Sequence, residues 1–172
     1  MGKQVDFGGN WRGFYEQGGR RHGISMVVAQ RGQSVVGRMR DDDTLLTTAH
    51  PQQVIVEAPD GEHDEAPPQR ERLAQLETIA ALPEYSSIEG DADGDRLVFE
   101  KRYLGPHQVT SWIDGHAEAH YTLHDHRVRY EGCLDPRGEL LVGRWLLGPS
   151  DAPQMSGTFE LRRQQDDGPA HH

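Results

Sequence analysis

The first forty residues alternate between apolar and polar positions in three short runs. A period of two places successive side chains on opposite faces, which is typical of β-strands. In the first run Trp11, Gly13 and Tyr15 share one face, and a Gly18-Gly19 pair follows where a turn is expected. The three runs cover residues 10–17, 23–30 and 34–40. They predict three antiparallel strands in a meander.

The alternation breaks between residues 41 and 84, which we interpret as an insertion. A strand candidate at 53–58 precedes a segment at 59–69 that is rich in proline and acidic residues, as in a solvated loop. Residues 71–82 then show apolar positions near helical spacing, and Pro83 follows as a stop signal. The apolar positions are Leu73, Leu76, Ile79, Ala80 and Leu82. We therefore predict one short amphipathic helix, which packs on the barrel or plugs one end.

Alternating runs return after residue 84, separated by turn signals such as Asp93-Gly94. They cover residues 85–90, 96–103, 108–113, 120–132 with one break, 140–147 and 155–163. The whole pattern predicts an all-β fold, an antiparallel meander β-barrel of about 8–10 strands with one short helix in the insertion. Residues 1–172 would form a single domain, with a disordered tail at about 164–172.

Charge and cysteine usage narrow the class of protein. The chain has 28 acidic and 18 basic residues, a formal net charge of -10, which repels nucleic-acid phosphates. The arginines near its start are interpreted as a solvated face paired with acids, so we expect no nucleic-acid partner. The single Cys133 excludes an internal disulfide, and no apolar run has the length of a signal peptide or a membrane span. The sequence predicts a cytoplasmic protein with no membrane partner.

Histidines gather in one short stretch of the second half. His116, Glu118, His120, His124 and His126 share parity, so they would face one side of a continuous strand. Imidazole and carboxylate groups bind zinc, copper or iron, and the pattern predicts a metal site. The alternative is a polar, solvent-facing hairpin that binds metal adventitiously, and the sequence assigns no cofactor.

Aromatic residues that carry a polar group suit the wall of an apolar ligand pocket as well as a core. We predict Trp112, Tyr130 and Tyr15 as ligand-binding residues, with packing in the core as the alternative role. His22 and His107 are interpreted as surface or satisfied histidines. The sequence contains no Gly-x-Ser-x-Gly nucleophile elbow, no phosphate-binding loop and no zinc-protease motif, so no catalytic residue is predicted.

The segment Gly9-Asn10-Trp11 resembles the Gly-x-Trp strand of the calycin superfamily, the lipocalins and avidins. In that family the tryptophan closes the bottom of the barrel. Residues 143–145 and 157–161 look like later strands of such barrels. The resemblance implies a cup-shaped barrel for small ligands, and it implies neither a catalytic residue nor a particular ligand.

The leading hypothesis is an intracellular barrel that binds a small, partly apolar molecule in its interior. One alternative is a barrel enzyme that holds a general acid or base, or a histidine-bound metal, in a dry pocket. The other alternative is a protein-interaction module without a ligand, which would use the acidic segment at 59–69 or an exposed strand edge.

Overall fold

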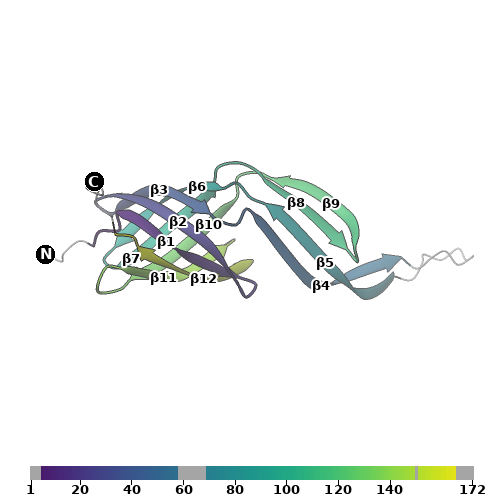
Figure 1. The fold of residues 1–172 in the computed structure, drawn as a ribbon. Coiled ribbons are helices and arrows are strands. Elements are labelled where there is room, and N and C mark those ends of the chain that lie inside the picture. The colour runs from purple at the N-terminus through teal and green to yellow at the C-terminus, as the bar shows by residue number, and fades with distance from the viewer. Residues whose placement is uncertain (1–4, 58–68, 150, 166–172) are drawn as a thin grey trace, which may run out of the picture.

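Eight antiparallel strands close into a barrel that forms one end of the molecule (Figure 1). Our computed structural model describes residues 5–57, 69–149 and 151–165. Each barrel strand pairs with the next barrel strand along the chain, and the last pairs with the first. The strands are β1 (Gly9–Gln17), β2 (Arg20–Arg31), β3 (Ser34–Asp41), β6 (Tyr85–Asp93), β7 (Arg96–Tyr103), β10 (Arg127–Leu134), β11 (Leu140–Leu147) and β12 (Met155–Arg163). The alternating pattern therefore predicted the all-β, antiparallel barrel.

Two hairpins leave the barrel and pair with each other in a second sheet, here called the extension sheet. The first consists of β4 (Leu45–Glu57) and β5 (Gln69–Ala81), and the second of β8 (His107–Ile113) and β9 (His116–Leu123). The strand order is β4-β5-β8-β9. Because successive strands of an up-and-down barrel alternate in direction, the β3–β6 and β7–β10 connections that carry the hairpins leave from the same end. The extension sheet therefore projects from that end, here called the open end (Figure 1).

The predicted helix at 71–82 is wrong, because these residues belong to β5. Their backbone pairs with β4 on one side and with β8 on the other. Thr78 and Ala80 face the barrel side of the sheet, whereas Leu73 and Ile79 lie on the opposite, exposed face. Apolar residues on both faces of one strand gave the helical spacing. Within the described residues there is no helix at all.

The barrel is also interrupted twice rather than once. Residues 108–113, predicted as a barrel strand, lie in β8 of the extension sheet. The run at 120–132 contains the end of β9, a turn and most of β10, and the turn residue Asp125 has a φ of 56°. The predicted tail at 164–172 and the acidic segment at 59–69 fall almost entirely outside the described residues.

The end of the barrel opposite the extension sheet, here called the closed end, is sealed by Trp11. This ring is 1% exposed, and its Nε1 donates a hydrogen bond to the carbonyl oxygen of Phe7 at 2.9 Å. The guanidinium of Arg163 lies 4.4 Å from the centre of the ring and donates to three backbone carbonyls. A cation over an aromatic face is attracted by the ring quadrupole. Trp11 thus lies at the end of the barrel where the calycin resemblance places it.

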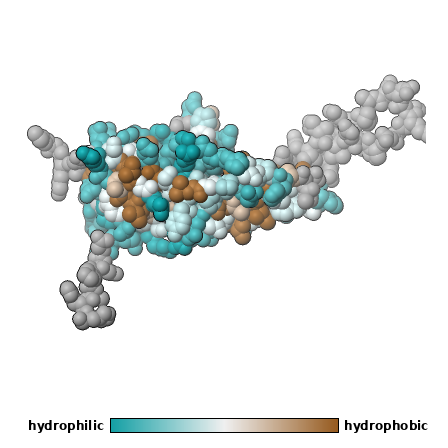
Figure 2. All heavy atoms as spheres, turned by 90° about the horizontal axis from the view of Figure 1, so that it is seen from above, coloured by the Kyte–Doolittle hydropathy of each residue, from teal (hydrophilic) through white to brown (hydrophobic). Residues whose placement is uncertain are grey.

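The outer surface of the barrel is mainly polar, with smaller apolar patches between the polar residues (Figure 2). Three of the early arginines pair with carboxylates: Arg12 with Asp42, Arg21 with Glu16, and Arg40 with Glu84. Exposed ion pairs of this kind contribute little to stability, but the carboxylates reduce the positive electrostatic field of the arginines. In the part of the chain that the structure describes, no helix has the length and apolarity needed to cross a membrane.

Candidate functional site

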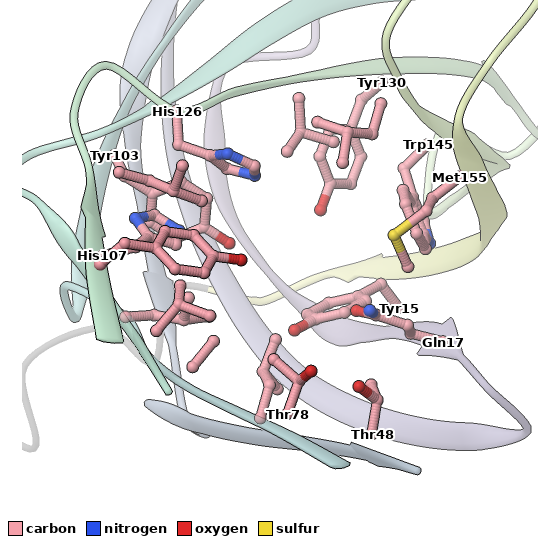
Figure 3. Close-up of a pocket in the computed structure, with 18 residues that line it drawn as sticks. Tyr15, Gln17, Thr48, Thr78, Tyr103, His107, His126, Tyr130, Trp145 and Met155 are labelled. Carbon is pink, nitrogen blue, oxygen red and sulfur yellow. The ribbon is translucent and has the colours of Figure 1, made fainter. Parts of the chain in front are cut away.

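A cavity of about 250 Å³ lies at the open end, between the barrel and the extension sheet (Figure 3). We call it the junction cavity. Its barrel wall is formed by Tyr15, Gln17, Tyr103, Val128, Tyr130, Trp145, Leu147 and Met155. Its other wall is formed by Leu46, Thr48, Thr78, Ala80, Val109, Tyr121 and Leu123, together with Leu82, His107 and His126. The two hairpins of the extension sheet and the barrel therefore all contribute to one cavity, which is partly open to solvent.

The space itself comes from small residues on the extension sheet. In β4 and β5 the side chains that face the cavity include Thr48, Thr78 and Ala80. Strand alternation selects them, because side chains two positions apart point to the same face. Thr78 also lies 3.4 Å from the hydroxyl of Ser111 on the neighbouring strand, which fixes its position in the sheet. Larger side chains at these positions would fill the cavity.

The barrel wall is built from aromatic rings that other rings hold in place. Tyr15 meets Trp145 edge-on, with ring centres 6.3 Å apart and an angle of 85° between the planes. Tyr130 stacks on Phe99 at 4.9 Å with an angle of 6°. Offset-stacked and edge-to-face pairs are the favoured arrangements of aromatic side chains. The wall is therefore pre-organised as a set of fixed ring surfaces.

Buried polar atoms without a hydrogen-bond partner lie at this cavity. They are the hydroxyl oxygen of Tyr15 and both ring nitrogens of His107. His107 is 3% exposed, so its ring cannot simply turn to bulk water. A buried donor or acceptor that stays unsatisfied costs about 1–3 kcal/mol, and most such groups in proteins have a partner. These atoms belong to residues of the cavity wall, and they are closed off from the cavity space as well as from bulk water.

The histidines of the cavity are held neutral by their surroundings. Burial, together with the nearby His126 and Lys101, lowers the pKa of His107 to about 4. Burial also lowers the pKa of His126, whose ring centre is 4.5 Å from that of His107. Desolvation disfavours the charged form of an imidazole. Near pH 7 both rings therefore present neutral nitrogens, and burial raises the pKa of Tyr15 and keeps its phenol protonated.

Beneath the cavity lies an ion pair that is completely enclosed in the barrel. Lys101 Nζ donates to both carboxylate oxygens of Asp41, at 2.8 and 2.7 Å, and the two side chains are 0% and 1% exposed. The ammonium group lies 4.4 Å from the ring centre of Tyr103 and 5.8 Å from that of Tyr15. Burial lowers the pKa of Lys101 and raises that of Asp41, and their mutual attraction opposes both shifts. The two charges do not cancel at every point of the cavity wall, because Lys101 lowers the pKa of His107 and His126 while Asp41 raises that of Tyr15.

The structure places two of the three predicted ligand-binding residues at the junction cavity and the third outside it. Tyr15 and Tyr130 line the junction cavity, from β1 and β10. Trp112 does not line it, because it occupies the opposite face of β8 from His107 and Val109. His107 and Val109, the two residues of β8 that line the cavity, are odd-numbered, whereas Trp112 is even-numbered.

The four predicted metal-binding histidines, whose side chains the structure describes, are distributed over different positions. Cross-strand pairing places His116 opposite Ile113 and His120 opposite Thr110, and a register shift in β9 puts these two histidines on different faces of the sheet. His120 lies 2.7 Å from the Thr110 hydroxyl, His124 is exposed, and His126 lines the cavity. The side chain of Glu118 lies outside the described residues. No group of three or more His, Cys, Asp or Glu side chains that could hold a metal is found among the described residues. The metal site stays a prediction from the sequence.

The sequence interpretation missed His107, whose buried nitrogens are the most distinctive feature of the site. His22, interpreted in the same way, does have a partner, since its Nδ1 lies 2.9 Å from an Asp43 oxygen. One signal for His107 was available: it begins a run in which His107 and Val109 share parity, so it shares the apolar face of that strand. Its burial, however, depends on Tyr103 and His126, which only the folded chain brings near it.

Comparison of the chain with models of protein families, with curated proteins and with solved structures gave no match. The eight-stranded antiparallel barrel is compatible with a calycin-like fold, and this compatibility is a statement about architecture. The function of the junction cavity must therefore be argued from its own geometry.

Proposed function

We propose that the chain is a calycin-like barrel that binds a small, partly apolar molecule in the junction cavity. The observation that carries the proposal is the mainly apolar lining of the junction cavity, in which aromatic side chains of the barrel face small and apolar side chains of the extension sheet. Ligand sites are typically concave and mostly apolar, with a few placed polar groups that orient the ligand. The junction cavity has each of these properties.

The two ends of the barrel support the same proposal. At the closed end the ring of Trp11 occupies the barrel interior, and its indole nitrogen donates a hydrogen bond to Phe7. At the open end the barrel interior leads into the junction cavity, and the extension sheet forms the other wall of this cavity. A molecule bound there would lie between the barrel and the extension sheet.

The proposal is tested by filling the cavity and leaving the rest of the sheet unchanged. Ala80→Trp places an indole in the cavity, whereas Thr47→Trp places the same group on the exposed face of the sheet. The probe is prodan, a neutral naphthalene fluorophore whose emission shifts to the blue in an apolar site. We expect saturable blue-shifted emission with the wild type and with Thr47→Trp, and at least about tenfold weaker binding with Ala80→Trp.

Thermal unfolding of the three proteins shows whether each is folded. The proposal is wrong if the wild type shows no saturable prodan binding. It is equally wrong if a folded Ala80→Trp variant binds prodan as tightly as Thr47→Trp does.

A further inference from the structure

We propose that the face of the extension sheet away from the junction cavity joins two copies of this chain into a symmetric dimer. This surface, here called the outer face, comprises the odd-numbered residues of 45–49 and 73–81 and the even-numbered residues of 108–112 and 120–122. Their neighbours of opposite parity in the same strands include the residues that line the cavity. The dimer is independent of the ligand proposed for that cavity.

The outer face carries little charge. Glu77 is the only Asp, Glu, Lys or Arg among its described side chains. In the barrel, by contrast, three successive outward positions of β10 are charged, namely Arg127, Arg129 and Glu131. The cores of protein–protein interfaces are depleted in charged residues. Although the chain has a net charge of -10, two copies can therefore meet on this face without bringing many like charges together.

Large apolar side chains on the outer face are exposed to water. Leu73 is 70% exposed, Leu45 is 65% exposed and Ile79 is 37% exposed. They lie on two neighbouring strands, since Leu45 is on β4 and the other two are on β5. Exposed apolar side chains that share one surface are typical of interaction sites, and covering them removes apolar area from water.

Polar side chains of the outer face are bonded to one another across the strands. The hydroxyl of Thr110 lies 2.7 Å from Nδ1 of His120, and the hydroxyl of Thr122 donates to Oε1 of Gln108 at 3.0 Å. A polar group that already has a partner costs less to remove from water than an unpaired one. The β8–β9 side of the face can therefore be covered at a modest cost.

The edges of the extension sheet are less suited to pairing with another chain than its face. The edge strand β4 contains Pro51, which has no backbone N–H, and the pairing of the other edge strand, β9, is interrupted by a register shift. Proline and bulges are features that protect edge strands from pairing with other chains. We therefore place the contact between copies on the face.

The sheet is large enough for a weak dimer. Its strands have 13, 13, 7 and 8 residues, which at about 4.8 Å between strands and about 3.4 Å per residue cover on the order of 650 Å². Two facing copies then contribute on the order of 1,300 Å², near the lower end of the range of about 1,200–2,000 Å² for specific interfaces. We therefore expect micromolar affinity.

A second copy suits this face because its sheet has the same twist. Sheets that pack face to face keep their strand directions within about 30° of each other, and a two-fold axis brings the same patch of both copies together. The extension sheet projects from one end of the barrel (Figure 1), so an axis that runs across the strands places the two barrels at opposite ends. Leu73, far from its own barrel, then faces the part of the other copy that holds Leu45 and Ile79. This arrangement also keeps the charged barrel surfaces apart.

The test is sedimentation equilibrium of the full chain. It is carried out in a reducing buffer, because a disulfide between exposed Cys133 side chains would also link two copies. We expect the wild type to show a reversible monomer–dimer equilibrium with a dissociation constant on the order of 10 µM. Leu73→Glu and Ile79→Glu each place a carboxylate in the contact and should raise this constant about tenfold or more.

The matched control is Val27→Glu, which adds the same charge at a valine that is 56% exposed on the outer surface of the barrel. Its dissociation constant should stay within about twofold of the wild-type value. All three replaced side chains are solvent-exposed in the monomer, so each variant should fold, and thermal unfolding of each shows that it does.

Two results would overturn the dimer. One is a wild type that stays monomeric up to about 200 µM, well above the expected dissociation constant. The other is a dimer that both extension-sheet variants leave intact, or that Val27→Glu weakens as much as they do, because such a dimer forms through another surface. Prodan binding by a monomeric wild type would leave the proposed function standing while the dimer is wrong.

Discussion

The two ends of the barrel use the same strands for opposite purposes. On β1, Trp11 and Tyr15 both point inward, four residues apart, one at each end. The indole N–H of Trp11 has a partner in Phe7, whereas the hydroxyl of Tyr15 is equally buried and has none. A barrel gains stability where its polar groups are satisfied internally. The unsatisfied groups lie at the other end, in the wall of the junction cavity where we propose that a ligand binds.

The largest expected effect comes from opening the closed end. Trp11→Ala removes a ring that is almost completely buried and leaves the guanidinium of Arg163 without its aromatic surface. We expect a loss of about 3–5 kcal/mol in the free energy of unfolding, measured by urea denaturation. Trp112→Ala, which removes the same side chain from a half-buried position on the extension sheet, is the control and should lose clearly less. Equal losses for the two variants would contradict the assignment of Trp11 as the seal.

An intermediate effect is expected from acidification at the open end. The pKa of His107 is about 4 in the folded chain, against 6.5 as its usual value. Below about pH 6.5 the His107 imidazole becomes protonated in the unfolded chain but stays neutral in the folded chain. The free energy of unfolding therefore falls as the pH falls towards 4. We expect the wild type to lose about 2–3 kcal/mol more than His107→Phe between pH 7 and pH 4.

Chemical denaturation of the two proteins at a series of pH values measures this difference. His126 and the other titrating groups are present in both proteins, so their contributions largely cancel. Parallel stability curves for the two proteins would show that His107 is not held neutral by burial.

The smallest effect on stability is expected from Tyr15→Phe. At a position whose hydroxyl has a partner, this change would remove a hydrogen bond and typically cost about 1 kcal/mol. Because the Tyr15 hydroxyl is buried without one, removing it should leave the midpoint of thermal unfolding unchanged or slightly raised. Trp11→Phe, which removes a satisfied N–H at the closed end, is the matched comparison and should lower the midpoint. A clear decrease for Tyr15→Phe would contradict the proposed difference between the two ends.

Local pattern predicted much of the barrel but not the extension sheet. The runs that became barrel strands alternate because one face of each strand packs in the core, as Trp11 and Tyr15 do. The strand β5 has no such contrast, since Leu73 is 70% exposed on one face and Thr78 faces the cavity on the other. Its partner β8 is distant in sequence, and its partner β4 is separated from it by the acidic segment. Short-range spacing therefore favoured a helix where long-range pairing makes a strand.

The candidate site was predictable only in part, for the same reason. Tyr15 and Tyr130 were predicted as ligand-binding residues because aromatic rings with a polar group suit a pocket wall, and both line the cavity, although their role stays a prediction. Trp112 was included on residue type alone, although its parity places it on the other face. His126 was grouped with neighbouring histidines as a metal ligand, and in the structure it faces His107 instead. The parity of a run can be derived from sequence, but the register shift in β9 that breaks it cannot.

By itself the sequence determined that this chain forms antiparallel strands, that its first strand carries the sealing Trp11, and that its surface is acidic. These properties follow from local alternation and composition. Only the tertiary structure decided that two hairpins meet beside the barrel mouth and enclose His107 against the barrel. The physical reason is that burial is a property of contacts between distant segments. A buried nitrogen without a partner therefore cannot be recognised until the chain has folded around it.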